Sequence, residues 1–413
     1  MQEPIQIFRR GLGLKKEVAS ELSEDYSSHI IDYFREHDFK MQIGRFTLHL
    51  AREFGFCYGV DRAIDYAYQT RKKFPDRRIF LTGEIIHNPY VNLKMLEMGI
   101  QFLTGQYAGN NSYDVLKPDD VVILPAFGIT TEEIALLKKI GCILVDTTCG
   151  SVLNVWKRVE QYARDGFTAI IHGKYWHEET RATCSQTTKY PDGHYLVVLN
   201  MEETERVCQY IAGKWSREAF FEAFGKAISP GFDPDRHLKK VGLANQTTML
   251  SSESLAIAER IRQEMVKKYG IEHIDEHFRT FDTICSATQD RQDAIIELVE
   301  NTDLDLVIII GGYNSSNTNH LAEISEKYTR AYHIDDASCL VSPEEIYYKP
   351  VHEDREAVEF GWLPEGSVNI GLTAGASTPN SKIGEVVWRL AEFESINLDE
   401  LLRKSSSKPQ VSQ

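Results

Sequence analysis

The sequence predicts an α/β protein built from three similar units, each with a small parallel sheet. Three observations lead to this prediction. Cys57, Cys149 and Cys285 each follow an apolar run and precede a helix-like pattern. Two further apolar runs come after each cysteine, and each of them ends in a polar or glycine-bearing loop. Strands that alternate with helical patterns in this way are typical of parallel sheets with crossover helices.

The cysteines stand in related local contexts. Asp-Thr-Thr-Cys149 and Asp-Thr-Ile-Cys285 match closely, and Gly-Phe-Cys57 is a looser copy. The apolar run before each cysteine has the length of a strand, and the residues after it repeat at helical spacing. The sequence therefore predicts a strand, a sharp turn that carries a thiol, and a helix, three times over.

These repeats also divide the chain. Its 413 residues are too many for one simple core and suit two or three domains. Residues 187–240 interrupt the rhythm of the second unit, so we expect an insertion there. The predicted segments are an N-terminal extension at 1–45, α/β units at 46–148, 149–283 and 284–390, and a low-complexity C-terminal tail at 391–413.

Polar side chains end the apolar runs that follow each cysteine. In parallel α/β units, ligands bind beyond the carboxyl ends of the strands, where helix N-termini offer free N–H groups. If the three units surround a common axis, these loops face one cavity with the thiols at its floor. The loops contain His87-Asn88 and Phe127-Gly128, His177 to Thr180 and Gln246 to Thr248, and Asn314 to Asn317 and Thr373 to Pro379.

Bulk properties exclude several classes of partner. The net charge of −15, from 46 basic and 61 acidic residues, argues against a polyanion such as nucleic acid. A small anion stays possible where local donors receive it. No apolar run approaches the roughly 18 to 20 residues of a membrane helix. The first residues resemble neither a signal sequence nor a transit peptide, so we expect a cytoplasmic protein.

The seven cysteines favour metal or redox chemistry over disulfides, because they are odd in number and widely spread. Cys142 and Cys208 are expected to be small buried apolar residues. No close C-x2-C pair suggests an ordinary zinc site. Three thiolates in equivalent turns suit a 4Fe-4S cluster with one iron free of protein ligands. From the residues alone, unrelated buried cysteines remain an alternative.

The motifs resemble the family of 4-hydroxy-3-methylbut-2-enyl diphosphate reductases, which catalyse the last step of the non-mevalonate (MEP/DOXP) isoprenoid pathway. The resemblance covers roughly Phe46 to Trp388. The N-terminal extension and the insertion resemble the cyanobacterial and plant branch. The matching motifs are Gly55-Phe-Cys57-Tyr-Gly-Val-Asp-Arg-Ala, Ile86-His87-Asn88, Asp146-Thr-Thr-Cys149, His177-Glu-Glu179-Thr, Gln246-Thr-Thr, Ile284-Cys285, Asn314-Ser-Ser-Asn-Thr-Asn and Thr373-Ala-Gly-Ala-Ser-Thr-Pro.

This resemblance implies a fold and a set of site residues. The family has three α/β units about a pseudo-threefold axis, with one 4Fe-4S cluster at the centre. Cys57, Cys149 and Cys285 resemble the cluster ligands. Glu179 resembles the proton donor, with His177 and Thr247 as its catalytic companions. The residues that resemble substrate-binding positions are His87, His177, Thr247, Ser315, Ser316, Asn317 and Ser377.

The implied reaction is a two-electron reductive dehydroxylation of an allylic diphosphate, giving isopentenyl and dimethylallyl diphosphates. Since no G-x-G-x-x-G motif opens a helix for a nicotinamide or flavin, electrons must come from outside. A ferredoxin is the donor that the branch implies. The basic segment Arg71-Lys-Lys with Arg77-Arg78 is a candidate for its docking.

Two positions depart from the family pattern. Many bacterial members have a histidine before the glycine of Phe127-Gly128, so one diphosphate contact is in doubt here. Glu178 stands where many members have proline, and we expect a solvated or helix-capping carboxylate.

Other readings remain open at this point. Ser315 to Asn317 could serve only as a helix cap, and His177 could be a structural hydrogen-bonding residue. A three-cysteine cluster would also serve a hydro-lyase that consumes no electrons, or a redox sensor. A zinc-stabilised binding protein is a third alternative.

Overall fold

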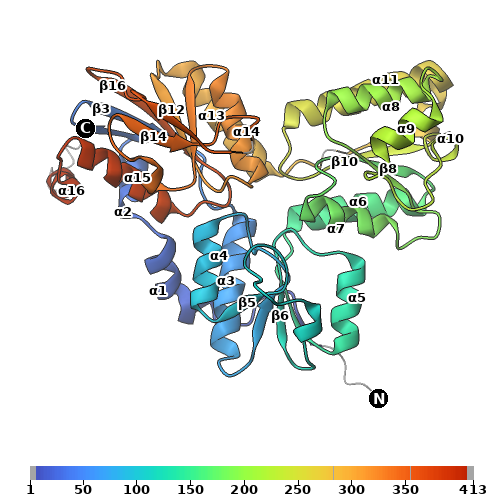
Figure 1. Ribbon diagram of the computed structural model, residues 1–413, viewed down its shortest axis with the longest axis horizontal. Helices are drawn as coiled ribbons and strands as arrows, with labels where there is room; N and C mark the ends of the chain where they lie inside the picture. Colours follow the sequence, from blue (N-terminus) through green and yellow to red (C-terminus); the bar gives the residue numbers. More distant parts are fainter. Residues whose placement is uncertain (1–5, 282, 354, 407–413) are drawn as a thin grey trace, which may run out of the picture. The chain divides into compact units, whose positions relative to one another are not determined.

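A computed structural model describes residues 6–281, 283–353 and 355–406 (Figure 1). Within this range the chain forms two compact bodies. Of the described residues, those within 6–13, 62–86 and 92–286 form the first body. Those within 14–61, 87–91 and 287–406 form the second body. Two parallel sheets lie in the first body, and a third sheet with a short hairpin lies in the second.

The first sheet has the strand order β1-β7-β6-β4-β5, and all its pairs are parallel. Its central strand β6 is apolar and buried throughout, as expected for a strand covered on both faces. The strands are β1 (Ile7–Phe8), β4 (Ile79–Leu81), β5 (Ile100–Phe102), β6 (Val121–Leu124) and β7 (Ile143–Asp146). The helical elements along this part of the chain are α3 (Tyr58–Lys73), α4 (Pro89–Glu97), η1 (Tyr113–Val115) and α5 (Thr131–Ile140).

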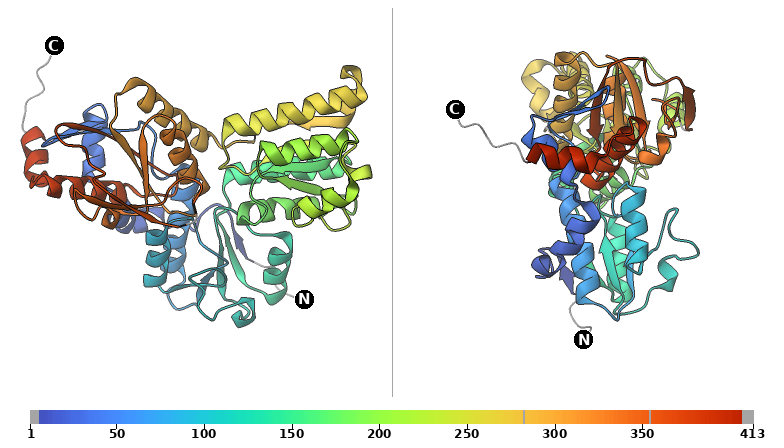
Figure 2. Two further views of the ribbon diagram at one scale, coloured as in Figure 1. Left: turned by 45° about the horizontal axis from the view of Figure 1, so that its top comes forward. Right: turned by 90° about the vertical axis from the view of Figure 1, so that its left-hand side faces the viewer.

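The second sheet has the order β11-β10-β8-β9 and is also parallel. Helices α8 and α11 pack together on one face, and α6 and α7 pack together on the other (Figure 1, Figure 2). The strands are β8 (Thr168–His172), β9 (Tyr195–Val198), β10 (Val241–Asn245) and β11 (Phe278–Thr280). The helices are α6 (Gly150–Arg164), α7 (Glu178–Thr187), α8 (Met201–Ile211), α9 (Arg217–Phe224), α10 (Pro234–His237), α11 (Ser251–Tyr269), η2 (Ile271–His273) and α12 (Ile274–His277).

The third sheet has the order β13-β12-β16-β3-β2, with only the edge strand β2 antiparallel. Its strands are β2 (Lys40–Ile43), β3 (Phe46–Leu50), β12 (Leu306–Ile310), β13 (Arg330–Ile334) and β16 (Val368–Ala374). The antiparallel hairpin is β14 (Glu345–Tyr348) with β15 (Ala357–Phe360). The helical elements of this part are α1 (Lys15–Tyr26), α2 (His29–Glu36), α13 (Ser286–Asn301), α14 (Ser316–Glu326), η3 (Ala337–Cys339), α15 (Asn380–Phe393) and α16 (Leu398–Ser406).

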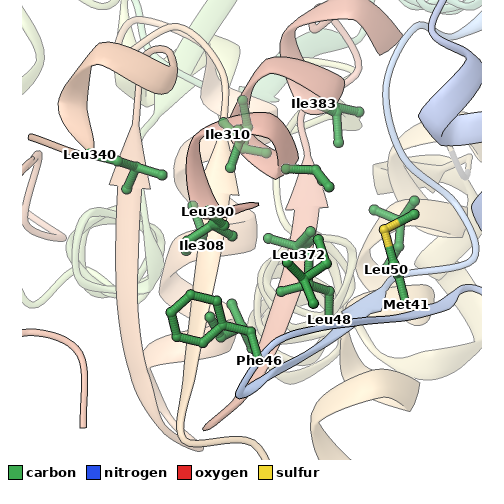
Figure 3. Close-up of a cluster of buried hydrophobic side chains, with 14 of the residues drawn as sticks. Met41, Phe46, Leu48, Leu50, Ile308, Ile310, Leu340, Leu372, Ile383 and Leu390 are labelled. Atoms are coloured by element: carbon green, nitrogen blue, oxygen red, sulfur yellow. The ribbon is translucent and has the colours of Figure 1, made fainter. Parts of the chain in front are cut away.

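The core of the second body lies between the third sheet and its helices. Apolar side chains of β3, β12 and β16 meet those of α15 there, as Figure 3 shows for Leu48, Ile308, Leu372 and Leu390. Each of these four side chains is fully buried. Packing of this extent fixes the strand ends, and the functional loops begin at those ends.

Each of the three predicted cysteine turns connects two different sheets. The chain leaves β3 of the third sheet, passes Cys57 and α3, and enters β4 of the first sheet. It leaves β7 of the first sheet, passes Cys149 and α6, and enters β8 of the second. It leaves β11 of the second sheet, passes Cys285 and α13, and enters β12 of the third. The α/β class with three small parallel sheets is confirmed, and the arrangement about a pseudo-threefold axis stays a prediction.

The flanking segments are more structured than the sequence suggested. The N-terminal extension supplies β1 to the first sheet and β2 to the third. The insertion at 187–240 adds β9 and three helices to the second sheet. Leu398 and Leu402 of α16 are buried in the core of the second body, so the tail is folded at least through this helix. In the part of the chain that the structure describes, no helix has the length and apolar character needed to cross a bilayer.

Candidate functional site

The three predicted metal-ligand cysteines differ from the other four in exposure. Cys57, Cys149 and Cys285 are partly exposed, whereas the remaining cysteines, including Cys142 and Cys208, are buried as expected. Each of the three directly precedes a helix, namely α3, α6 or α13. The free N–H groups and the positive end of the dipole at a helix N-terminus stabilise a thiolate.

The turn before Cys149 explains why its motif contains Asp-Thr-Thr. The carboxylate of Asp146 accepts hydrogen bonds from the backbone N–H (3.1 Å) and the hydroxyl (2.6 Å) of Thr148. The hydroxyl of Thr147 donates to the carbonyl of Leu124 on the neighbouring strand β6 (2.6 Å). Short polar side chains therefore close the turn and fix it to the sheet.

The three cysteine turns share one backbone contact. The strand before each cysteine pairs with β6, β10 or β16. The backbone N–H of the cysteine donates to the carbonyl of the second residue after the end of that paired strand. This shared register supports the threefold repeat that the motifs predicted. The acceptors are Ala126 for Cys149 (2.9 Å), Thr247 for Cys285 (3.4 Å) and Ala376 for Cys57 (3.2 Å).

Cys149 and Cys285 influence each other within the first body. Burial raises the pKa of the Cys149 thiol, the N–H of Ser151 opposes this rise, and a charged Cys285 nearby adds to it. The hydroxyl of Ser151 also donates to the sulfur of Cys285 (3.3 Å). A bound metal ion deprotonates such thiols, because its charge outweighs the cost of burial.

Glu179 is a buried carboxylate, with 1% of its surface exposed, in the first turn of α7. Its two oxygens accept hydrogen bonds from the backbone N–H (2.6 Å) and the hydroxyl (3.0 Å) of Thr247. His177 is the N-cap of α7, and its Nδ1 accepts from the N–H of Glu179 (3.1 Å). In the neutral ring, Nε2 therefore carries the proton and is a donor.

The contacts of Thr247 join the expected residues of the first body into one network. Thr247 bonds Glu179 through its side chain and Cys285 through its carbonyl, and His177 bonds Glu179. Ser151 completes the link from Cys285 to the turn of Cys149.

A second network lies in the second body, around Asn317. This side chain is 2% exposed, and its Oδ1 accepts from the N–H of Ala376 (2.8 Å). That bond fixes the amide orientation, and Nδ2 has no hydrogen-bond acceptor among the residues the structure describes. A buried, oriented N–H donor without an acceptor indicates a place for a ligand oxygen.

The other predicted donors of the second body lie close to Asn317 in the chain or in space. Ser315 is the N-cap of α14 and accepts from the N–H of Thr318 (3.3 Å), so it does act as a helix cap. Ser377 donates to the carbonyl of His87 (3.0 Å). Because Ser316 is the first residue of α14, the predicted binding residues include a helix N-terminus suited to an anion.

Phe127 lies in the loop where the sequence was expected to depart from the family that its motifs resemble. Its ring lies edge-on to the ring of His177, with centroids 5.8 Å apart and an angle of 78°. The following residue, Gly128, has φ of +76°, and a Cβ there would collide with the ring of Trp156. The loop therefore requires glycine, and Phe127 packs against a site residue.

Two side chains at these networks were not predicted as site residues. Ser151 contacts the thiol of Cys285, and the amide nitrogen of Asn314 lies 3.4 Å from Nδ1 of His87. Asn314 belongs to the motif that contains Ser315 and Asn317, so it could have been predicted from the sequence. Ser151 could not, because its partner Cys285 is 134 residues away in the sequence. Glu178 is exposed, as expected.

Comparisons with known proteins identify the relatives of this chain. The chain is 47% identical over 393 residues to 4-hydroxy-3-methylbut-2-enyl diphosphate reductase of Gloeobacter violaceus, covering 94% of this chain and 93% of that protein. It is 47% identical over 387 residues to the protein of the same name from a Synechococcus strain, covering 94% and 95%.

Two solved structures are similar. One is a structure of (E)-4-hydroxy-3-methyl-but-2-enyl diphosphate reductase, with a TM-score of 0.51 and 26% identity, covering 84% of this chain and 99% of that chain. The Plasmodium falciparum reductase matches in fold, with a TM-score of 0.61 and 23% identity, covering 84% and 89%. The family described as LytB protein matches residues 48–391. The chain belongs to the LytB family.

Proposed function

We propose that this chain reduces 4-hydroxy-3-methylbut-2-enyl diphosphate to isopentenyl and dimethylallyl diphosphates, the last step of the non-mevalonate isoprenoid pathway. The reaction takes up two electrons and two protons, of which the second goes to carbon. The first proton joins the hydroxyl oxygen as its bond to carbon breaks, and water leaves. The allylic carbanion that remains takes a proton at either of two carbons, which gives the two products.

The observation that carries this proposal is the set of three equivalent cysteine turns. Cys57, Cys149 and Cys285 are partly exposed, precede helices and share one backbone register. Three soft thiolates in equivalent positions fit a 4Fe-4S cluster with one iron free of protein ligands. When bound, the cluster would supply electrons one at a time and a Lewis-acidic iron for the substrate hydroxyl.

The second body supplies neutral donors for the diphosphate. Asn317 directs Nδ2 away from its own backbone contact, and Ser315, Ser316 and Ser377 add hydroxyls near a helix N-terminus. His87 completes the set. Hydrogen bonds to a charged oxygen are stronger than neutral ones, so neutral donors hold an anion even in a protein of net charge −15.

The first body supplies the proton. Glu179 is buried, and the hydroxyl of Thr247 lies 3.0 Å from its oxygen, so a proton passes between them without a large movement. A hydroxyl both donates and accepts, which suits Thr247 to relay the proton toward the leaving oxygen. His177, with the proton on Nε2, orients the substrate hydroxyl.

The electrons come from an external one-electron carrier, and a ferredoxin is the carrier we propose. The substrate is a small molecule, and neither nucleic acid nor a membrane has a role in the reaction. The cytoplasmic location predicted from the sequence stays a prediction.

The proposal is tested by purifying the protein without oxygen and measuring iron and acid-labile sulfide. We expect about four of each per chain. The same preparation should convert the hydroxylated allylic diphosphate with two reducing equivalents consumed per product.

Each alternative has its own signature in this experiment. A hydro-lyase would turn over without consuming reductant, and a redox sensor would consume reductant without forming product. A zinc-stabilised protein would contain zinc and no sulfide. Any of these results would contradict the proposal.

A further inference from the structure

The proposed reaction needs electrons from a protein partner, and two arginines of the predicted basic docking segment make contacts within the first body. Arg71 donates to backbone carbonyls of the turn after α3, including that of Arg77 (3.1 Å). Arg78 forms a two-point ion pair with the buried carboxylate of Asp120. Lys72 and Lys73 are exposed and form no ion pair with a described residue. Arg71 therefore fixes the turn after α3, and Arg78 joins the starts of β4 and β6.

A different basic surface opens beside Cys149. A cavity of about 500 Å³ in the first body has an apolar wall of Ile129, Ile134 and Leu153. Four cations and two carboxylates also line it, so its net charge is about +2 in a protein of net charge −15. The charged lining residues are Arg9, Arg62, Lys138, Lys189, Asp146 and Glu160.

The cations of this cavity remain accessible. The side chain of Arg9 is 69% exposed although it pairs with Asp146, and that of Lys189 is 42% exposed although it pairs with Glu160 (2.6 Å). Lys138 is exposed in the last turn of α5, and it forms no ion pair within the described part of the chain. An apolar wall with an accessible basic rim suits an acidic protein surface.

Hydrogen bonds connect this rim to the turn of Cys149. Arg9 pairs with Asp146 (3.3 Å), and Asp146 accepts from the hydroxyl of Thr148, the residue directly before Cys149. Arg62 donates to the carbonyl of Thr148 (3.4 Å). A carrier bound at Arg9 is therefore linked to Cys149, a proposed cluster ligand, through two polar contacts and one peptide unit.

We propose that the cavity rim formed by Arg9, Lys138 and Lys189 is the docking surface for a small acidic iron-sulfur electron carrier of the ferredoxin class. This inference rests on the proposed function. Two reduced carriers each give up one electron per product, and the substrate takes both electrons with two protons as water leaves. The strand β1 of the N-terminal extension then has a role, because it places Arg9 on the rim.

The test compares Lys138→Glu with Lys72→Glu in the anaerobically purified holoenzyme. Both changes reverse one exposed charge and alter the net charge equally. Turnover is measured with a reduced plant-type ferredoxin and, separately, with dithionite and methyl viologen. We expect Lys138→Glu to raise the KM for ferredoxin about tenfold and to flatten the dependence of the rate on ionic strength. Its dithionite-driven turnover and cluster absorbance should match the wild type.

Lys72→Glu should leave both activities within about twofold of the wild type, because its position lies outside the rim. Arg9→Gln is a second variant, and a smaller rise in the ferredoxin KM would support the same surface. Equal effects of Lys138→Glu and Lys72→Glu would overturn the proposal, as would an unchanged ferredoxin KM in Lys138→Glu. If inorganic diphosphate raised the KM for ferredoxin at saturating substrate and constant ionic strength, and Lys138→Glu removed that effect, the cavity would be a small-anion site and the proposal would be overturned. Absence of dithionite-driven product in the wild type would contradict the proposed function itself.

Discussion

The second and third sheets place different chemistry on the same scaffold. In the second sheet, helix α7 follows β8, and β8 pairs with β10. In the third sheet, helix α14 follows β12, and β12 pairs with β16. The loops after β10 and β16 each contact a cysteine. The second residue of each helix, Glu179 or Asn317, accepts a backbone N–H from that loop. The loop residues are Thr247 and Ala376, whose carbonyls accept the N–H of Cys285 and Cys57.

The difference between the two lies in the side-chain head group. Glu179 has a carboxylate, and Thr247 adds a hydroxyl that bonds it, which suits this position to the proposed proton transfer. Asn317 has a carboxamide whose Nδ2 faces no acceptor in the described chain, which suits this position to the proposed binding of an anion. One repeated scaffold thus holds the proposed proton donor in one body and the proposed anion site in the other.

The first sheet shows what happens without such a side chain. The corresponding loop N–H, that of Ala126, donates to the backbone carbonyl of Ile85 (3.3 Å). Phe127 follows it, where the third sheet has Ser377. This loop therefore contributes packing against His177 in place of a polar group.

The largest expected effect comes from replacing the carboxylate of Glu179 by the carboxamide group that Asn317 has at the corresponding position. Glu179→Gln should keep the bond from the Thr247 N–H but remove the transferable proton. We expect turnover with dithionite to fall about 100- to 10,000-fold while iron and sulfide content is unchanged. Glu202→Gln is the control, because Glu202 is an exposed carboxylate in the first turn of α8, and it should stay near wild-type turnover. Normal turnover in Glu179→Gln would remove its assigned role.

The reverse exchange places a carboxylate in the third sheet. Asn317→Asp should replace a donor to the diphosphate by a like charge, so we expect kcat/KM to fall roughly 100-fold, mainly through KM. Asn301→Asp adds the same charge at the exposed end of α13 and serves as the control. Inhibition by inorganic diphosphate should weaken in parallel. An unchanged inhibition constant would contradict the anion site.

A smaller effect should follow from removing only the side-chain hydroxyl of Thr247. Thr247→Val keeps the backbone bonds to Glu179 and Cys285 but deletes the side-chain donor, so we expect kcat to fall about tenfold. Thr248→Val removes only the acceptor of a bond from Gln246 and should cost less. If Thr248→Val proves the more damaging of the two, the relay through Thr247 is wrong.

The smallest effect concerns Phe127 in the loop after β6 of the first sheet, where the sequence departs from the family pattern. Phe127→Leu removes the edge-on ring contact to His177, a contact of about 0.5 to 1.5 kcal/mol, so kcat/KM should fall about threefold. Phe127→Tyr keeps the ring and should restore most of the activity. A Phe127→Leu enzyme with full activity would show that the ring does not position His177.

The local turns could be predicted from sequence because their causes are local. The Asp-Thr pair before Cys149 closes its own turn, and Thr130 with Glu133, three residues apart, forms the capping box of α5. Thr283, in the repeated motif, likewise bonds Asn245 on the neighbouring strand. Glycine at 128 was visible in the motif, and its positive φ gives the physical reason.

What could not be predicted depends on partners far apart in the chain. No local sequence feature shows that β3 pairs with β16. The sequence therefore did not predict that the chain passes from one sheet to another at each cysteine. The same holds for the bond from Ser151 to Cys285 and for Arg9 against Asp146. The contacts of Arg71 and Arg78 were equally unpredictable, because basic residues close in sequence look alike whether they face solvent or hold a turn.

The measurement that tests the shared scaffold most directly is steady-state kinetics of Glu179→Gln and Asn317→Asp with dithionite as reductant. The proton and anion roles predict a split: Glu179→Gln should lower kcat with little change in KM, and Asn317→Asp should raise KM with a much smaller change in kcat. The reverse split, or the same pattern in both variants, would contradict the assignment of the two head groups.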